Sequence, residues 1–142
     1  MTARVSTNSH HTARGMILIH SASAALCPHI EWAIGSVLGN RVQVTWTTQP
    51  AEPGAKRGEW SWTGPVGTGA ALSSALARLM QLRFEVTENA SDGVDGERFS
   101  YVPGLGLWRG STSANGDVVI GEMQLRAMIE AGGWGQLHYL EE

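Results

Sequence analysis

The sequence predicts an α+β fold, because two stretches of the chain have the same order of elements. Residues 16–46 carry the pattern of a strand, a helix and a strand, and residues 60–87 repeat that order. Strands show alternating or continuous apolar residues, whereas helices show apolar residues three and four positions apart. The combined β-α-β-β-α-β order is typical of a ferredoxin-like sandwich.

The first strand is predicted over Met16–His20, a short continuous apolar run of the kind found in central strands. The first helix is predicted over Pro28–Leu38, because proline suits the first helical position and Cys27 would then be the N-cap. Its apolar stripe consists of Ile30, Ile34, Val37 and Leu38, and Gly39-Asn40 ends it.

Alternation predicts two further strands. Val42, Val44 and Trp46 alternate with polar residues, and after a long loop Trp60 and Trp62 do the same. The three tryptophans are expected to pack on one sheet face.

The second helix is predicted over Ala70–Gln81, with Thr68 as its N-cap, and the fourth strand over Leu82–Thr87. We expect an antiparallel four-stranded sheet with Met16–His20 in its interior beside Leu82–Thr87. Both helices should lie on one face.

The last third of the chain predicts a C-terminal β-hairpin and helix packed against this unit. Strands are expected over Phe99–Val102, Gly104–Arg109 and Asp117–Ile120, with Asn115-Gly116 as the hairpin turn. A third helix is expected over Glu122–Ala131. We therefore predict a mobile arm at 1–14 and a single domain at 15–142, with a ferredoxin-like unit at 15–88 and a C-terminal extension at 97–142.

Composition limits the function classes. Charged residues make up only 16% of the 142 residues, which favours a surface that docks onto a partner protein. The net charge of −3 gives no basic footprint for nucleic acid. A single cysteine, no secretory signal and no long apolar run predict a cytoplasmic protein without membrane insertion.

Cys27, His20 and His29 form the sharpest candidate site. The start of the first helix and the end of the first strand are expected to approach, and a helix N-terminus or an imidazole lowers a thiol pKa. These residues could serve a thiol enzyme. We favour a structural role, because no third orienting residue can be named, and we expect no metal because the Cys-x-His spacing is not typical of zinc.

The turn before the second helix is a candidate anion site, formed by Gly64, Gly67, Thr68 and Gly69. Backbone N–H groups at a helix N-terminus can bind a phosphate or carboxylate. The turn has no lysine and lacks the Rossmann spacing, so we favour a turn that lets the helix pack closely on the sheet.

Two groups of side chains stand outside these motifs. The charged run with Asp92, Asp95, Glu97 and Arg98 is interpreted as a solvated connection rather than an acid–base pair or cation site. Trp108, Trp134 and Tyr139 are either core residues or anchors for a protein partner, since aromatic residues are common at binding hot spots.

Several segments together resemble an actinobacterial family known as domain of unknown function 3145. The resemblance covers about Gly15 to Ala131. It is carried by His20–Ala22, Ala25–Trp32, Gly67–Gly69, Leu82–Glu88 and Asp95–Phe99. Genes of this family often lie beside genes for fatty-acid synthesis, including ketoacyl synthases and acyl-CoA carboxylase subunits.

The residues and the resemblance together predict a non-catalytic accessory or regulatory protein that needs no cofactor. Its expected partner is a larger enzyme of acyl-CoA carboxylation or fatty-acid synthesis, such as an acyl-CoA carboxylase or fatty-acid synthase component. The alternative is a small ligand-binding domain or thiol enzyme that uses Cys27, His20 and the Gly64–Gly69 turn.

Overall fold

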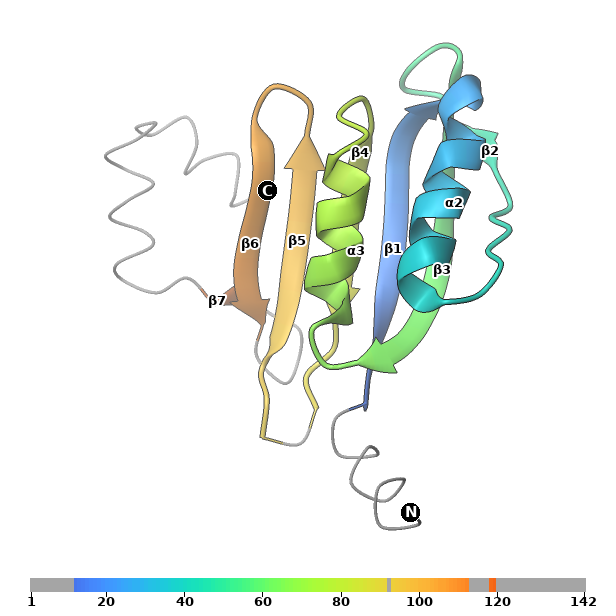
Figure 1. Ribbon diagram of the computed structural model, residues 1–142. Coiled ribbons are helices and arrows are strands. Elements are labelled where there is room, and N and C mark those ends of the chain that lie inside the picture. Colours follow the sequence, from blue (N-terminus) through green and yellow to red (C-terminus); the bar gives the residue numbers. More distant parts are fainter. Residues whose placement is uncertain (1–11, 92, 113–117, 120–142) are drawn as a thin grey trace, which may run out of the picture.

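The computed structural model describes residues 12–91, 93–112 and, for the backbone alone, 118–119. These residues form one antiparallel sheet with two α-helices on one of its faces (Figure 1). The elements are β1 (Thr12–Ser23), a 3-10 turn (Ala24–Leu26), α2 (Cys27–Leu38), β2 (Thr47–Thr48), β3 (Ala55–Pro65), α3 (Thr68–Ala77), β4 (Arg83–Glu88), β5 (Gly96–Val102), β6 (Gly106–Thr112) and β7 (Val118–Val119). The predicted α+β class is confirmed.

The sheet order is β2-β3-β1-β4-β5-β6-β7, and every neighbouring pair is antiparallel. The predicted interior strand is confirmed, because β1 lies between β3 and β4, with Ile17 opposite both Trp60 and Val86. β1 begins at Thr12, so residues 12–14 belong to the sheet rather than to an arm. Residues 1–11 lie outside the described residues.

The two faces of β1 differ more than its continuous apolar run suggested. Ile17 and Ile19 are buried beneath the helices, whereas Met16 and Leu18 are only half-buried on the opposite face. No helix covers that opposite face within the described part of the chain, and we call it the helix-free face.

The helices cover the other face side by side, as predicted (Figure 1). α2 contributes Ile30 and Ile34 to the core, and α3 contributes Leu72 and Leu76. α2 starts at Cys27 itself, with Leu26 as its N-cap, and α3 starts after a Gly67 cap. α3 ends at Ala77, before the predicted Gln81, in a turn that includes the positive φ of Met80.

The predicted strand over residues 42–46 is wrong. Strand β2 is restricted to Thr47–Thr48. The physical reason is a side chain of α2: the Glu31 carboxylate accepts hydrogen bonds from the Val44 backbone N–H (2.8 Å) and from Trp46 Nε1 (3.1 Å). Val42 and Val44 are still buried. The alternation of apolar and polar residues therefore predicted burial correctly, but it did not predict strand pairing correctly.

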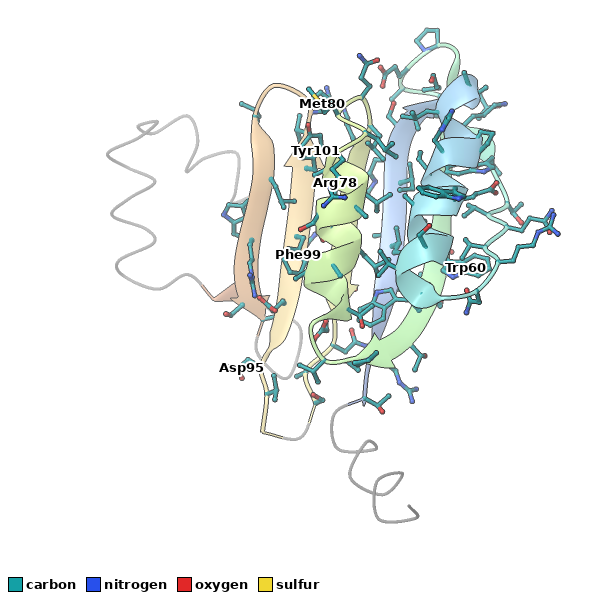
Figure 2. The ribbon with its side chains drawn as sticks, viewed as in Figure 1. Trp60, Arg78, Met80, Asp95, Phe99 and Tyr101 are labelled. Carbon is teal, nitrogen blue, oxygen red and sulfur yellow. The ribbon has the colours of Figure 1, made fainter. Side chains whose placement is uncertain are left out.

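The predicted pairing of the C-terminal strands is confirmed, because β6 is antiparallel to β7, with Ser111 opposite Val119, but these strands do not pack as a separate hairpin against a four-stranded unit. They extend the same sheet beyond β4, which makes it seven-stranded over the described residues. Figure 2 shows Phe99 and Tyr101 on β5, beside α3. Phe99 is buried in the common core and Tyr101 stacks on Phe84 with ring centroids 5.5 Å apart, so no packing boundary separates 15–88 from the strands that follow. The predicted turn at 115–116 and the predicted third helix lie outside the described residues.

Candidate functional site

Cys27 is the first residue of α2 and is buried, at 6% exposure. Its Sγ donates a weak hydrogen bond to the Ser23 carbonyl oxygen at 3.5 Å. Burial, followed by the negative charge of Glu31, raises the pKa of the Cys27 thiol. A raised pKa keeps the sulfur protonated at neutral pH, which opposes a nucleophilic role.

The two histidines of the candidate site do not hydrogen-bond to the Cys27 thiol. His29 is exposed on α2, and the ring of His20 lies on the helix-free face, where its Nε2 is 3.2 Å from Glu85 Oε2. No hydrogen bond joins Cys27 to either histidine in the part of the chain that the structure describes.

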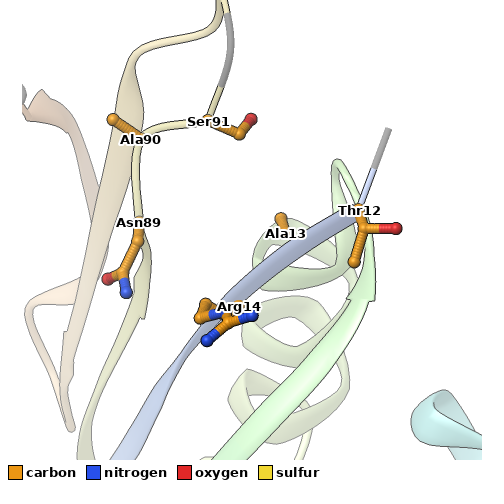
Figure 3. Close-up of a pocket in the computed structure, with 6 residues that line it drawn as sticks. All are labelled: Thr12, Ala13, Arg14, Asn89, Ala90 and Ser91. Atoms are coloured by element: carbon orange, nitrogen blue, oxygen red, sulfur yellow. The ribbon is translucent and has the colours of Figure 1, made fainter. Parts of the chain in front are cut away.

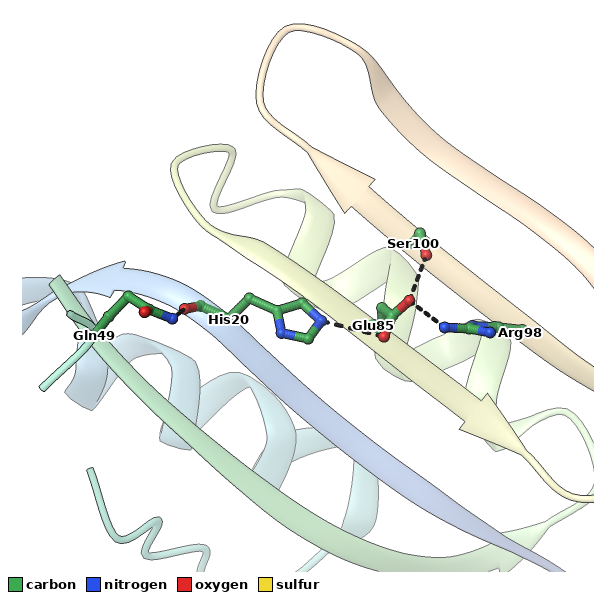
Figure 4. A network of polar contacts seen from close by, with 5 residues as sticks. All are labelled: His20, Gln49, Glu85, Arg98 and Ser100. Atoms are coloured by element: carbon green, nitrogen blue, oxygen red, sulfur yellow. Dashed lines mark hydrogen bonds and ion pairs between the residues drawn. The ribbon is translucent and has the colours of Figure 1, made fainter. Parts of the chain in front are cut away.

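Glu85 is the centre of the polar network that holds His20 (Figure 4). Its Oε1 accepts hydrogen bonds from Arg98 Nη2 at 2.6 Å and from Ser100 Oγ at 3.3 Å. The carbonyl oxygen of His20 in turn accepts a bond from Gln49 Nε2 at 2.7 Å. Three strands and the loop before β3 are thereby joined across the helix-free face.

These contacts stabilise the ionised carboxylate. The hydrogen bond from His20 contributes most and the bond and charge of Arg98 add to it, so the pKa of Glu85 falls from 4.5 to about 2 despite its partial burial. Glu85 is therefore a permanent anion at neutral pH. Because both its oxygens are already engaged, the network tethers strands rather than offering a free general base.

The glycine-rich turn does bind an anion, but the anion belongs to the chain. The carboxylate of Glu88, at the end of β4, accepts the Gly67 N–H through Oε2 (3.1 Å) and the Gly69 N–H through Oε1 (2.8 Å). The carboxylate thus lies against the positive end of the α3 dipole. Glu88 is buried, at 4% exposure, so it closes the turn from within.

The sequence of the turn suits this internal contact. A Cβ on Gly69 would lie 3.1 Å from the Glu88 side chain and 3.3 Å from the Phe99 ring, so glycine allows the close approach. Gly67 has a φ of 99°, which favours glycine. Thr68 Oγ1 donates to the Pro65 carbonyl oxygen at 2.6 Å. The favoured prediction, a turn that packs the helix closely, agrees with this geometry.

A hollow of about 450 Å³ lies at the start of β1 (Figure 3). It is lined by Thr12, Ala13, Arg14, Asn89, Ala90 and Ser91. Two of the backbone groups in this hollow are already paired, since the Asn89 N–H donates to the Arg14 carbonyl oxygen at 2.8 Å. The lining offers one guanidinium and several small polar groups, and no catalytic pair.

The described acidic residues of the predicted charged run do not form a joint site, and Asp95 is exposed. Glu97 pairs with Arg109 across β5 and β6, while Arg98 points to Glu85 on the other face. Asp92 lies outside the described residues. No group of three or more His, Cys, Asp or Glu side chains able to hold a metal ion occurs among the described residues.

The most exposed large aromatic residue that the structure describes is one that the sequence did not single out. Trp32 is 76% exposed on the outer side of α2. It borders a groove of about 370 Å³, lined by Glu31, Trp32, Gly35, Ser36, Gly39, Asn40, Arg41 and Val42. The signal was available, because Trp32 lies two positions from both Ile30 and Ile34 and so falls off the apolar stripe.

Of the three predicted anchors, Trp108 is among the described residues. Trp108 is half-buried on β6, opposite Ser100, and its Nε1 is buried without a hydrogen-bond partner among the described residues. Trp134 and Tyr139 lie outside the described residues, so their role stays a prediction. Other large apolar side chains that the structure shows exposed are Val66, Met80, Val94, Leu105 and Leu107.

Neither described helix is long and apolar enough to cross a membrane. No curated protein and no solved structure matches this chain. Residues 16–141 match the family described as "Protein of unknown function (DUF3145)". Because this match covers nearly the whole sequence and agrees with the resemblance of its motifs, the chain belongs to the DUF3145 family.

Proposed function

We propose that this protein is a non-catalytic accessory or regulatory protein that binds a larger enzyme of acyl-CoA carboxylation or fatty-acid synthesis. The observation that carries the binding role is the exposure of Trp32 beside a groove. Tryptophan is enriched among the few residues that supply most of the energy of a protein interface.

The surroundings of Trp32 support a role in recognition. The carboxylate of the adjacent Glu31 accepts hydrogen bonds from Val44 and Trp46. These bonds hold the segment after α2, which forms the other wall of the groove. Gly35 allows the Asn40 carbonyl oxygen to lie against α2, whereas Ser36 and Gly39 are small and a Cβ on Gly39 would meet nothing within 4 Å, so a partner side chain can approach there. Arg41 adds a positive charge at the rim.

The kind of partner is supported by the family rather than by the groove. Genes of the family often lie beside fatty-acid synthesis and acyl-CoA carboxylase genes, which suggests a shared process. A cytoplasmic location belongs to the same proposal, and it is supported by the single, buried cysteine.

We further propose that β1 to β4, with α2 and α3, form a ferredoxin-like unit to which β5, β6 and β7 are added. The order β2-β3-β1-β4 within the sheet and the position of both helices on one face support this assignment. Since this fold hosts many unrelated activities, it adds no evidence about function.

The alternative of a ligand-binding domain or thiol enzyme would need a free turn or an activated thiol. The internal carboxylate of Glu88 occupies the turn, and burial raises the pKa of Cys27. Protein binding therefore has the better support.

The test is affinity purification of the tagged, full-length protein from its native cell, with partners identified by mass spectrometry. We expect a larger enzyme of acyl-CoA carboxylation or fatty-acid synthesis among them. The recovered enzyme is then titrated against Trp32→Ala and against Met80→Ala, a matched control at an exposed apolar residue elsewhere. Trp32→Ala should weaken binding by about thirtyfold, as for a central anchor.

Two results would contradict the proposal separately. Recovery of no such enzyme would reject the function. Equal binding by the native protein and by Trp32→Ala would reject this surface, and Trp108→Ala, Trp134→Ala and Tyr139→Ala would then test the C-terminal third.

A further inference from the structure

One side of β3 has no strand beside it over most of its length. β2 pairs with β3 only at Thr47–Arg57 and Thr48–Lys56. On its other side β3 pairs with β1 as far as Pro65. Residues 58–65 therefore form an outer edge of the sheet along which the described residues provide no neighbouring strand.

The segment before β2 does not fill this edge. Its Val44 N–H is bonded to Glu31 of α2, and no backbone hydrogen bond joins residues 41–46 to residues 58–65. The segment lies on the helix side of the sheet, because a Cβ on Gly58, opposite the buried Ile19, would be 2.5 Å from Val44 Cγ1. No strand among the described residues therefore pairs with residues 58–65 on this side.

An edge of this kind is competent to pair. Every second residue of an antiparallel strand directs its N–H and C=O outward, toward the next strand. Proteins commonly protect such edges with lysine, proline or bulges. Along residues 58–65 the only charged side chain is Glu59, and the only proline, Pro65, stands at the very end.

We propose that this edge pairs with the same edge of a second copy of the chain. The two β3 strands would run antiparallel about a two-fold axis at Ser61, giving one continuous sheet with all helices on one face. A two-fold interface of this type requires a surface that is complementary to itself.

Residues 58–64, which are centred on Ser61, meet that requirement. In this register Ser61 faces Ser61 of the second copy, and Glu59 faces the other copy's Thr63, so no like charges are opposed. Trp60 faces the backbone of Trp62 of the second copy on the helix side, because the Trp62 ring is buried in its own copy, where its Nε1 donates to the Thr87 carbonyl oxygen at 3.1 Å. Trp60 is only half-buried within one copy and would gain cover.

The register predicts opposite effects for two matched substitutions. Ser61 and Thr63 are both exposed on the same face of the same strand. Ser61→Lys would place two ammonium groups opposite each other at the axis, whereas Thr63→Lys would place each ammonium opposite a Glu59 carboxylate. Like charges directly opposite destabilise a strand pair and opposite charges stabilise it.

The experiment is sedimentation equilibrium of the full chain over a wide range of concentrations, with circular dichroism to verify folding. We expect the native protein to dimerise, Ser61→Lys to dimerise about fivefold or more weakly, and Thr63→Lys to dimerise at least as well as the native protein. A native protein that stays monomeric at several hundred micromolar overturns the proposal. Equal effects of the two substitutions overturn it as well.

Cross-linking tests the register without relying on charge. Directly opposite residues of an antiparallel pair have Cα atoms about 4.5–5.5 Å apart, which suits a disulfide. In a Cys27→Ser background, Ser61→Cys should give a covalent dimer on mild oxidation and Thr63→Cys should not. Efficient cross-linking of Thr63→Cys, or none of Ser61→Cys, rejects the two-fold axis at Ser61.

Discussion

The carboxylate of Glu88 holds the N-terminus of α3 through the backbone N–H of Gly69, 2.8 Å away and 19 residues earlier in the chain. Glu88 ends the core strand β4, so a strand residue performs the capping that no side chain of the turn supplies. The anion-binding capacity of the glycine-rich turn is thus used within the fold.

Glu88→Gln should destabilise the protein. The amide keeps one acceptor oxygen but turns its NH₂ group toward a backbone donor, and it loses the charge that favours the helix dipole. We expect a loss of about 1.5–3 kcal/mol in the free energy of unfolding, typical of hydrogen bonds to a charged group. Urea denaturation measures it, with the exposed Glu59→Gln as the control; equal stability of the two variants would show that the cap contributes nothing.

Glu88→Ala should create the external anion site that the native protein lacks. Removal of the carboxylate leaves the Gly67 and Gly69 N–H groups at a helix N-terminus without their acceptor. Added acetate or formate should therefore raise the melting temperature of Glu88→Ala more than that of the native protein. Equal responses to the salt would mean that the emptied turn binds no carboxylate.

Glu85 should make stability depend on pH in the acid range. Its folded-state pKa of about 2 lies below the ordinary 4.5, so the unfolded chain takes up the proton first as the pH falls. The stabilisation is complete above about pH 5 and is lost progressively as the pH falls toward 2. Because the side chains of His20 and Arg98 are 50% and 40% exposed, solvent screens their interaction with Glu85. The contribution of Glu85 to the free energy of unfolding is therefore about 1–2 kcal/mol.

The corresponding measurement compares urea unfolding of the native protein and Glu85→Gln at pH 7, 4 and 2.5. Glu85→Gln should be less stable at pH 7, and the difference should shrink at low pH. A difference that is the same at all three values would exclude a role for the ionised carboxylate.

Cys27 should react slowly. Its raised pKa and its burial both reduce the supply of accessible thiolate at pH 7. We expect alkylation by iodoacetamide to be slower than that of glutathione, and Cys27→Ser to fold with a modest loss of stability. Alkylation faster than that of glutathione would restore the thiol-enzyme hypothesis.

Local patterns in the sequence were enough to predict most of the sheet and both helices. Ile17, Ile34 and Leu76 are buried as their periodicity predicts. The buried face of a helix or strand can be read from the spacing of apolar residues within one short segment. The strand predicted at Val42–Trp46 failed for a non-local reason. A carboxylate on α2, 13 residues from Val44, takes the N–H that a strand would have used.

The candidate sites were harder to predict for the same reason. Whether the turn at Gly67–Gly69 binds a ligand depends on Glu88, and no local pattern joins the two segments. One signal was present: Phe84, Val86 and Glu88 alternate, which places a carboxylate on the buried side of the strand. A buried acid needs hydrogen-bond donors, and the nearest ready-made donors are those of a helix N-terminus.

The contact between Glu88 and the turn also bears on how the protein opens. The first amides of a helix normally exchange with solvent through local fraying, without disturbing the rest of the fold. Here the Gly67 and Gly69 amides are bonded to the side chain of the last residue of β4, so fraying of α3 must also break a contact with the sheet. Loss of the first turn of α3 is thereby coupled to loosening of the core strand β4.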